Sequence, residues 1–346
     1  MLLLQTLVCA GCLIQMVSAM HIVHTFRDLH KDTTLQNLKA NKNSGDVFVG
    51  ATNSLYHFAA DLRSFQKVAM GPRVDNPHCP PPNLPCNDTK KSTNSFSEGI
   101  AIDYKDSTLI SCISLFHGIC QIRQLQNISL IVKELLKPSV PNNPVKSSLI
   151  FIGPGLENQN ALYIGAAYSN LGNQKYRAMV PHISSRNLST LEFSYLDSSG
   201  GTRVSILPEA RLDIPVEFLY GFSYGGFVYF IARQYKSVIE YMFVTKIIRI
   251  CQQDKYFSSY TEIELTCQPH YDFARGAYFD ESSEKLYIVF ENNEFDMDGP
   301  SAVCGYNMAE TERLFNLTVE ECFNGDGNLG PSHIRESVPC PPKVSA

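Results

Sequence analysis

The sequence predicts an all-β protein, built either as a propeller or as a large sandwich. Short segments rich in β-branched and aromatic residues recur along the chain, and Gly, Asn, Asp and Ser bound them, which is the pattern of strands joined by turns. The strand pairs form antiparallel units of roughly 50–60 residues, although their spacing is irregular. Helical candidates are few. These observations together favour an antiparallel β architecture.

Four strand pairs carry most of this prediction. They are Val47–Ala51 with Leu55–Phe58 around Thr52-Asn53-Ser54, Ser148–Gly153 with Ala161–Ala167, Phe218–Tyr220 with Phe227–Ala232 around Ser223-Tyr224-Gly225-Gly226, and Gly276–Phe279 with Leu286–Glu291. Each pair is predicted to form a β-hairpin. Two short helices are predicted elsewhere, over Ser129–Leu136 and Met308–Phe315.

The composition is that of an ordinary globular protein, with 44% hydrophobic and 18% charged residues and a formal net charge of −5. Nucleic-acid binders usually carry a basic face, so this small negative charge argues against a nucleic-acid partner. No linker rich in Gly or Ser divides the chain. The Pro-rich stretch Pro77–Pro85 contains Cys79 and is followed directly by Cys86, and we interpret it as a pinned loop within one domain.

Residues 1–19 are predicted to be a secretory signal peptide, cleaved after Ala19. Residues 2–19 form an apolar run that ends in small residues, as such signals do. The alternative is an uncleaved membrane anchor, but a run of this length interrupted by two glutamines is marginal for spanning a bilayer. No later stretch is apolar and long enough to cross a membrane. The mature chain is therefore expected to start near Met20 and to be exported.

The cysteines and sequons fit export to an oxidising compartment. Of the 11 cysteines, Cys9 and Cys12 leave with the leader, so nine remain. Because thiols in such compartments normally end as disulfides, an odd number implies one partner outside this chain. Four N-x-S/T sequons are predicted glycosylation sites: Asn87, Asn127, Asn187 and Asn316.

Several long segments of the chain resemble the sema domains of plexins. Val47–Phe58, VFVGATNSLYHF, is similar to the opening strand pair of a sema domain. Further similar segments are Gly71–Pro81, Cys112–Leu125, Gly221–Phe230 and Ser301–Cys340. The resemblance implies a sema-type β-propeller, which in the family has seven four-stranded blades. Counting hairpins against that plan predicts roughly the first five blades here, so residues 20–346 are expected to be a partial sema domain.

The resemblance also implies how the cysteines pair. The implied disulfides are Cys79 with Cys86, Cys112 with Cys120, Cys267 with Cys304, and Cys322 with Cys340. Cys251 is left unpaired in this chain, because in plexins the equivalent cysteine bonds to one that lies shortly beyond the last residue here. A zinc site is not expected, since after the predicted leader the chain has no C-x-x-C and no second matched pair at ligand spacing.

An enzymatic interpretation rests on one motif. Gly221–Gly225 fits the G-x-S-x-G pattern of a hydrolase nucleophile elbow around Ser223. That elbow needs a helix after the serine, whereas Gly226–Ile231 reads as a strand. We therefore expect a β-turn here, whose glycines supply the positive φ of a tight turn. No catalytic residues are predicted, and the protein is not expected to be an enzyme.

Other polar clusters also favour structural roles over a metal or cofactor site. The acidic run Glu291–Asp298 lacks the spacing of a calcium loop and is interpreted as a solvated loop. His21, His24 and His30 have no acidic or cysteine neighbours at ligand spacing and are expected on the surface. His78 directly precedes the Cys79–Cys86 loop and His117 lies inside the Cys112–Cys120 loop, and both are expected to be packing or surface groups. No cofactor is predicted.

The function implied by the resemblance is protein recognition. A plexin-like sema domain is the ligand-binding ectodomain of a membrane-anchored receptor, and its partner is the sema domain of a semaphorin. The chain is expected to be secreted or to lie on the extracellular face of the plasma membrane. The alternative is a Met-like receptor or an adhesion module that uses the same propeller. Tyr168–Lys175 and Tyr195–Arg203 are plausible interface stretches. A glycan on Asn127 or Asn187 would block a protein partner nearby, so an interface is expected to avoid those positions if they are occupied.

Overall fold

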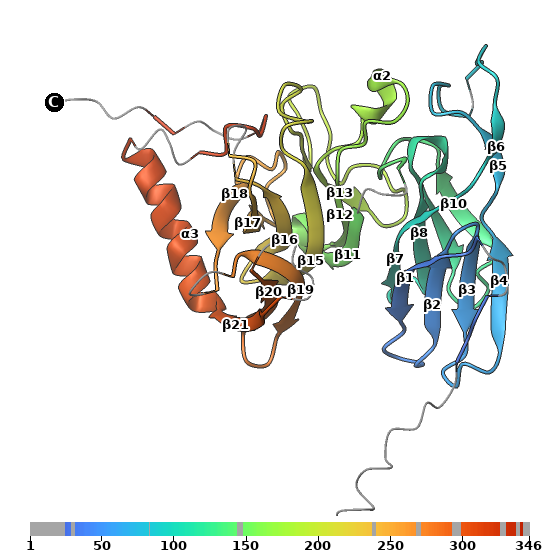
Figure 1. Ribbon diagram of the computed structural model, residues 1–346, viewed down its shortest axis with the longest axis horizontal. Helices are drawn as coiled ribbons and strands as arrows, with labels where there is room; N and C mark the ends of the chain where they lie inside the picture. Colours follow the sequence, from blue (N-terminus) through green and yellow to red (C-terminus); the bar gives the residue numbers. More distant parts are fainter. Residues whose placement is uncertain are drawn as a thin grey trace, which may run out of the picture.

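The computed structural model describes residues 25–28, 32–82, 84–143, 148–236, 240–267, 271–292, 299–325, 330–336 and 340–341. Within this part of the chain, four four-stranded antiparallel sheets and one three-stranded sheet follow one another in sequence order (Figure 1). The predicted all-β, propeller-type fold is therefore confirmed. The leader predicted over residues 1–19 lies outside the described residues.

The sheets are numbered here 1 to 5 in chain order. Sheet 1 holds β1 (Leu35–Ala40), β2 (Val47–Ala51), β3 (Ser54–Phe58) and β4 (Phe65–Ala69). Sheet 2 holds β7 (Ser97–Asp103), β8 (Thr108–Ile113), β9 (Ile119–Gln124) and β10 (Ile131–Leu135). Sheet 3 holds β11 (Ser148–Pro154), β12 (Asn160–Ala166), β13 (Ile183–Asn187) and β14 (Arg203–Val204).

The remaining elements complete the chain. Sheet 4 holds β15 (Val216–Tyr224), β16 (Phe227–Tyr235), β17 (Phe243–Cys251) and β18 (Thr261–Leu265). Sheet 5 holds β19 (Phe273–Asp280), β20 (Lys285–Glu291) and β21 (Ser301–Asn307). A ribbon of β5 (Arg73–Asp75) and β6 (Lys91–Thr93) projects between sheets 1 and 2. Among the described residues, the α-helices are α2 (Gln174–Arg177) and α3 (Met308–Phe323), and short 3₁₀ turns lie at Leu115–His117 and Leu156–Asn158.

All four hairpins predicted from the sequence are confirmed. They are the antiparallel pairs β2–β3, β11–β12, β15–β16 and β19–β20. The turn between β15 and β16 contains Gly225 and Gly226, whose φ angles are 57° and 85°. Because L-residues with side chains rarely adopt this conformation, the two glycines make the tight turn possible.

The sheets are arranged as propeller blades. The first strand of each sheet contacts the first strand of the next, in the order β1, β7, β11, β15 and β19. Glycines allow this close approach. A Cβ added to Gly221 would lie 2.1 Å from Cε1 of Phe151, and one added to Gly99 would lie 2.4 Å from Cγ1 of Ile150. The role expected for Gly221 in the turn is therefore wrong, because this glycine serves blade packing.

Sheet 4 is the centre of the core. Its strand β16 alternates between two hydrophobic clusters, as a strand with both faces covered must. Phe230 packs with Tyr163 and Phe218 toward sheet 3, and Tyr229 packs toward sheet 5 and α3. Phe230 and Tyr229 are both fully buried. Burial of both faces explains the nearly continuous apolar sequence of β16.

One of the two predicted helices is wrong. Residues Ser129–Leu136 contain the edge strand β10, which pairs antiparallel with β9 and has a bulge near Ile131. A short apolar run fits either element by periodicity, and here the unpaired backbone of β9 supplies hydrogen bonds that favour a strand. The helix predicted over Met308–Phe315 is confirmed and extends to Phe323. Its first turn is capped by the Asn307 side chain, which accepts a hydrogen bond from the Glu310 amide (3.3 Å).

Candidate recognition surface

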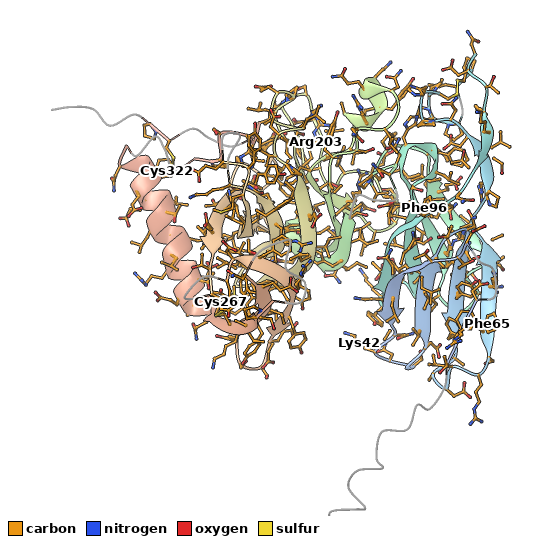
Figure 2. All side chains as sticks on the ribbon, in the orientation of Figure 1. Lys42, Phe65, Phe96, Arg203, Cys267 and Cys322 are labelled. Atoms are coloured by element: carbon orange, nitrogen blue, oxygen red, sulfur yellow. A yellow bond between two sulfur atoms is a disulfide. The ribbon has the colours of Figure 1, made fainter. Side chains whose placement is uncertain are left out.

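The structure contains the four disulfides that the resemblance implies. They are Cys79–Cys86, Cys112–Cys120, Cys267–Cys304 and Cys322–Cys340, of which Figure 2 labels Cys267 and Cys322. The first closes the loop of the β5–β6 ribbon, and the second joins paired residues of β8 and β9. The third links the end of β18 to β21, so it ties sheet 4 to sheet 5. Cys251, half-buried at the end of β17, forms no disulfide.

His78 and His117, which lie at the two short disulfide loops, have different environments. His117 is buried, and one of its ring nitrogens, Nε2, lies 2.6 Å from the carbonyl oxygen of Cys79. Burial lowers the pKa of His117, which favours the neutral ring. His78 is exposed. These positions agree with packing and surface roles. His21, His24, His30 and most of the acidic run Glu291–Asp298 lie outside the described residues.

Ser223 has no catalytic surroundings in the described part of the chain. It lies in β15, and β16 follows the turn, so the strand that the sequence predicts after the motif is confirmed. Its Oγ is buried without a hydrogen-bond partner. The adjoining space of about 610 Å³ is lined by the first strands of the sheets, and no described lining residue is a histidine. A nucleophilic serine needs a base within hydrogen-bond reach, and none is present among these residues.

The first predicted interface stretch, Tyr168–Lys175, leads into α2. Gly172 adopts a φ of 77°, and the amide of Asn173 donates to the carbonyl oxygen of Pro77 (2.9 Å), just before the Cys79–Cys86 disulfide loop. Beyond this anchor, the guanidinium groups of Arg177 and Arg211 lie 5.8 and 5.5 Å from the ring centre of Tyr168. The stretch is therefore held against the connection between β5 and β6 and presents a tyrosine between two arginines.

The second predicted stretch, Tyr195–Arg203, runs along the outer part of sheet 3. The hydroxyls of Tyr195 and Tyr256 both donate to Asp197 Oδ2, at 2.7 and 2.8 Å, and their rings meet edge to face. Lys255 Nζ lies 5.1 Å from the ring centre of Tyr195. Tyr256 and Lys255 come from the loop between β17 and β18, so sheet 4 completes this cluster. The sequence offers no signal for that partnership, because the residues are far apart in the chain.

These side chains form what we name the basic-aromatic surface. Its members are Tyr168, Arg177, Tyr195, Arg203, Arg211, Lys255 and Tyr256. Arg203 adds to it by stacking 5.5 Å from the ring centre of Phe193, and Figures 1 and 2 show α2 and Arg203 toward the same end of the molecule. Lys255 and Tyr256 are exposed and the other members are half-buried. A chain of net charge −5 thus carries a locally basic area.

Hydrogen bonds also set the charge within the second cluster. Donation from Tyr195, and then from Tyr256, lowers the pKa of Asp197. The pKa of Tyr256 is raised by its side-chain interactions with Tyr195 and Asp197. The Asp197 carboxylate therefore stays ionised and the Tyr256 phenol stays protonated at neutral pH, and the hydrogen bonds hold the cluster together.

The described residues contain neither a metal-binding cluster nor a membrane-spanning helix. No group of three His, Cys, Asp or Glu side chains is placed to hold a metal ion in that part of the chain. Among the same residues, no helix combines the length and the apolar character needed to cross a bilayer. The predicted sequon asparagines Asn87, Asn187 and Asn316 are exposed, and Asn127 is half-buried.

Comparison with known proteins identifies the relatives of the chain. No family model matches it. Plexin-A4 of Homo sapiens is 26% identical over 350 residues, which are 88% of this chain and 18% of that protein. Plexin-A2 of Mus musculus is 28% identical over 353 residues, again 88% of this chain and 18% of that protein. The chain therefore spans about a fifth of the length of these curated relatives.

Solved structures agree with the sequence comparison. The full extracellular region of Plexin A4 matches 90% of this chain and 38% of its own with a TM-score of 0.77 and 25% identity. Domains 1–2 of the Drosophila Semaphorin 1a ectodomain match 86% of this chain and 56% of their own, with a TM-score of 0.52 and 14% identity, which shows a shared fold. The resemblance is confirmed: over nearly nine-tenths of its length, the chain is similar to the sema-type propeller of plexins.

Proposed function

We propose that this chain is an extracellular, non-enzymatic recognition domain that binds a semaphorin through the basic-aromatic surface. The observation that carries this proposal is the stacking of arginines and a lysine on exposed or half-buried aromatic rings at the outer parts of sheets 3 and 4. Tyrosine and arginine are the residue types that most often dominate the binding energy of protein interfaces.

The rigidity of this surface supports a role in recognition. Asp197 holds two tyrosine hydroxyls, and Gly200 lies under Tyr256, where an added Cβ would come within 3.2 Å of the ring. Side chains that are already ordered lose less entropy when a partner binds. The basic groups favour a partner with an acidic face, because complementary charge accelerates association and fixes the binding mode.

An extracellular location is supported by two observations. Four disulfides are stable in oxidising compartments and are rare in the cytosol. The matched part of Plexin A4 is described as an extracellular region. A semaphorin partner follows from the plexin resemblance, and the relatives found are plexins, which does not favour a Met-like receptor.

The test is a binding titration between the secreted chain and a semaphorin sema dimer. Removing a central Tyr or Arg anchor typically costs at least about 2 kcal/mol, which corresponds to roughly a thirtyfold rise in Kd. We expect this rise for Arg203→Glu and for Tyr256→Ala. Lys133→Glu is the matched charge reversal, since Lys133 is an exposed lysine on β10 of sheet 2. The proposal is wrong if the semaphorin does not bind or if Lys133→Glu weakens binding as much as Arg203→Glu.

A second function, adhesion through self-association, is favoured by one observation. The outer face of sheet 5 exposes Tyr278, Tyr287, Val289 and Val303. Contiguous exposed apolar side chains are typical of interaction surfaces. Sedimentation velocity of the chain alone distinguishes the two functions. A concentration-dependent dimer that Val303→Asp abolishes would support adhesion, and a monomer that binds the semaphorin would support the receptor function.

A further inference from the structure

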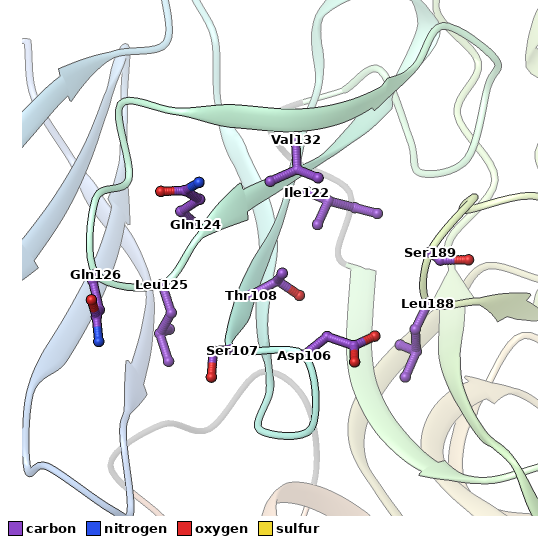
Figure 3. Close-up of a pocket in the computed structure, with 10 residues that line it drawn as sticks. All are labelled: Asp106, Ser107, Thr108, Ile122, Gln124, Leu125, Gln126, Val132, Leu188 and Ser189. Atoms are coloured by element: carbon purple, nitrogen blue, oxygen red, sulfur yellow. The ribbon is translucent and has the colours of Figure 1, made fainter.

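A groove of about 510 Å³ lies between sheets 2 and 3 (Figure 3). Ile122, Leu125, Val132 and Leu188 provide its apolar lining, and Gln124 and Gln126 provide amide groups. The groove is within the size range of small-molecule sites, and its mixture of apolar and hydrogen-bonding groups suits a ligand that has both kinds of surface.

A sequon lies at the rim of this groove. Leu188 and Ser189 line it, and they directly follow Asn187, which is exposed at the end of β13. Asn187 Oδ1 accepts hydrogen bonds from the Ser189 amide (2.9 Å), the Ser189 hydroxyl (2.7 Å) and the Thr190 amide (3.1 Å). None of the hydrogen bonds between described residues uses Asn187 Nδ2, the atom to which an N-linked glycan is attached.

We propose that the first sugars of an N-linked glycan on Asn187 occupy this groove. N-acetylglucosamine combines apolar CH faces with hydroxyl and acetamido groups, so it can contact Leu188 and Val132 while it hydrogen-bonds Gln124. The tether raises the effective concentration of the sugar at the groove, so even a weak contact is populated. The inference is independent of the proposed partner and requires only that the chain be exported.

The glycan would also cover an exposed strand edge. Leu130, Ile131 and Val132, at the start of β10, are 48%, 46% and 58% exposed. Because β10 is the last strand of its sheet, its outer backbone groups and these apolar side chains form a site for unwanted pairing with other chains. A sugar seated beside Val132 would shield this edge.

Asn127 also adjoins the groove, because it directly follows the lining residue Gln126, and its Oδ1 accepts from the Ser129 amide and hydroxyl, but its further contact differs from that of Asn187. Asn127 Oδ1 accepts from Gln66 Nε2 (2.9 Å), so its side chain is held toward β4 of sheet 1. Asn316 lies within α3, where Thr318 Oγ1 donates to the Leu314 carbonyl oxygen. Asn87 is exposed beside the Cys79–Cys86 disulfide, remote in sequence from the groove and absent from its lining. Asn87 therefore provides a matched control.

The test is hydrogen–deuterium exchange of peptides covering β9 and β10, on the full chain secreted from cells that add oligomannose glycans. Glycopeptide mass spectrometry first measures occupancy of Asn187. We expect exchange in β10 to be at least about threefold slower in the glycosylated chain than in Asn187→Gln, because seated sugars reduce local opening. Ser189→Thr, which keeps the sequon, and Asn87→Gln should both behave as the parent chain.

Enzymatic treatment of the folded chain keeps the test decisive if Asn187→Gln is not secreted. Removal of the whole glycan by an amidase should accelerate exchange in β10. Trimming with an endoglycosidase that leaves one N-acetylglucosamine should preserve most of the protection. An unoccupied Asn187, or equal exchange in β10 with and without the glycan, would overturn the proposal.

Discussion

The strands β16 of sheet 4 and β20 of sheet 5 are both rich in aromatic and β-branched residues but have very different surroundings. In β16 of sheet 4, side chains on both faces are buried, whereas in β20 of sheet 5 buried and exposed residues alternate. Ile288 and Phe290 of β20 are fully buried against sheet 4, while Val289 between them is 43% exposed. The neighbouring sheet therefore determines which face of a blade strand is buried.

Sheet 1 shows a third arrangement of a blade face. Its side chains Tyr56, Phe58 and Phe65 pack around the ring of Phe26, with ring centres 4.7–5.3 Å apart. A single aromatic residue from the segment before β1 therefore covers a face that no described sheet covers. On the outer face of sheet 5, Tyr278 and Val303 are 62% and 67% exposed.

The largest expected effect on the free energy of unfolding comes from substitution of Phe230, in the centre of sheet 4. Phe230→Ala would leave a cavity between Phe151, Tyr163 and Phe218, whose rings lie 5.3–6.4 Å from that of Phe230. We expect the free energy of unfolding to fall by about 3–5 kcal/mol. Urea denaturation followed by fluorescence measures it, and a loss below about 1 kcal/mol would mean that sheet 4 is not the centre of the core.

A glycine pair tests the packing between blades. Gly221→Ala places a Cβ 2.1 Å from the Phe151 ring, whereas no atom lies within 4 Å of a Cβ added to Gly276 in sheet 5. Overpacking should reduce the free energy of unfolding by about 1–3 kcal/mol for Gly221→Ala. Gly276→Ala should change it by no more than about 0.5 kcal/mol. Equal effects in thermal denaturation would show that the sheets do not meet as described.

The segment that follows α3 should make sheet 4 sensitive to acid. His333 lies buried with its Nε2 3.6 Å from Glu262 Oε2, near Lys246, and burial lowers the pKa of His333. An unfolded histidine titrates near pH 6.5, so the unfolded state binds the proton first and stability is lost as the pH falls below about 6.5. His182, buried against Phe218, acts in the same direction because burial lowers its pKa to about 3.

The measurement is the urea midpoint of the parent chain and of His333→Gln at pH 7 and pH 5. We expect the midpoint of the parent chain to fall further between the two pH values than that of the variant. Burial raises the pKa of Glu98 to about 8, which favours the folded state on acidification in both proteins, so the comparison removes its effect. Burial alone would raise the pKa of Glu262, but Lys246 and His333 lower it. The stability that the ionised Glu262 contributes is therefore lost only at a lower pH. Equal changes would exclude His333 as the acid-sensitive group.

The smallest effect is expected on the outer face of sheet 5. Val303→Ala removes two methyl groups from a side chain that is 67% exposed. The free energy of unfolding should change by no more than about 0.5 kcal/mol. A loss as large as that of a core substitution, measured on the isolated monomer, would mean that another part of the chain covers this face.

Much of the fold was predictable because the strands and turns carry local signals. The pair β2–β3 shows alternating apolar residues around Thr52-Asn53, and Gly225-Gly226 marks the turn after β15. The helix predicted over Ser129–Leu136 is wrong because the sequence of this segment cannot show that β9 has an unpaired edge for it to join. The role of Gly221 depends on Phe151 from another sheet, so no local pattern reveals it.

The candidate surface was only partly predictable. The stretches Tyr168–Lys175 and Tyr195–Arg203 contain some of its residues, but Lys255 and Tyr256 reach it only because sheets 3 and 4 pack side by side. Arg211 joins Tyr168 across a similar gap in sequence. Side-chain clusters built from different sheets follow from the tertiary arrangement, which one sequence alone does not display.

The most direct test of the recognition account is a hydrogen–deuterium exchange footprint of the chain with and without a saturating semaphorin sema dimer. We expect slower exchange in peptides covering 168–180, 195–203 and 254–260, and unchanged exchange in β19, β20 and β21. Protection confined to sheet 5, or no protection at a concentration where binding is complete, would show that the basic-aromatic surface is not the binding site.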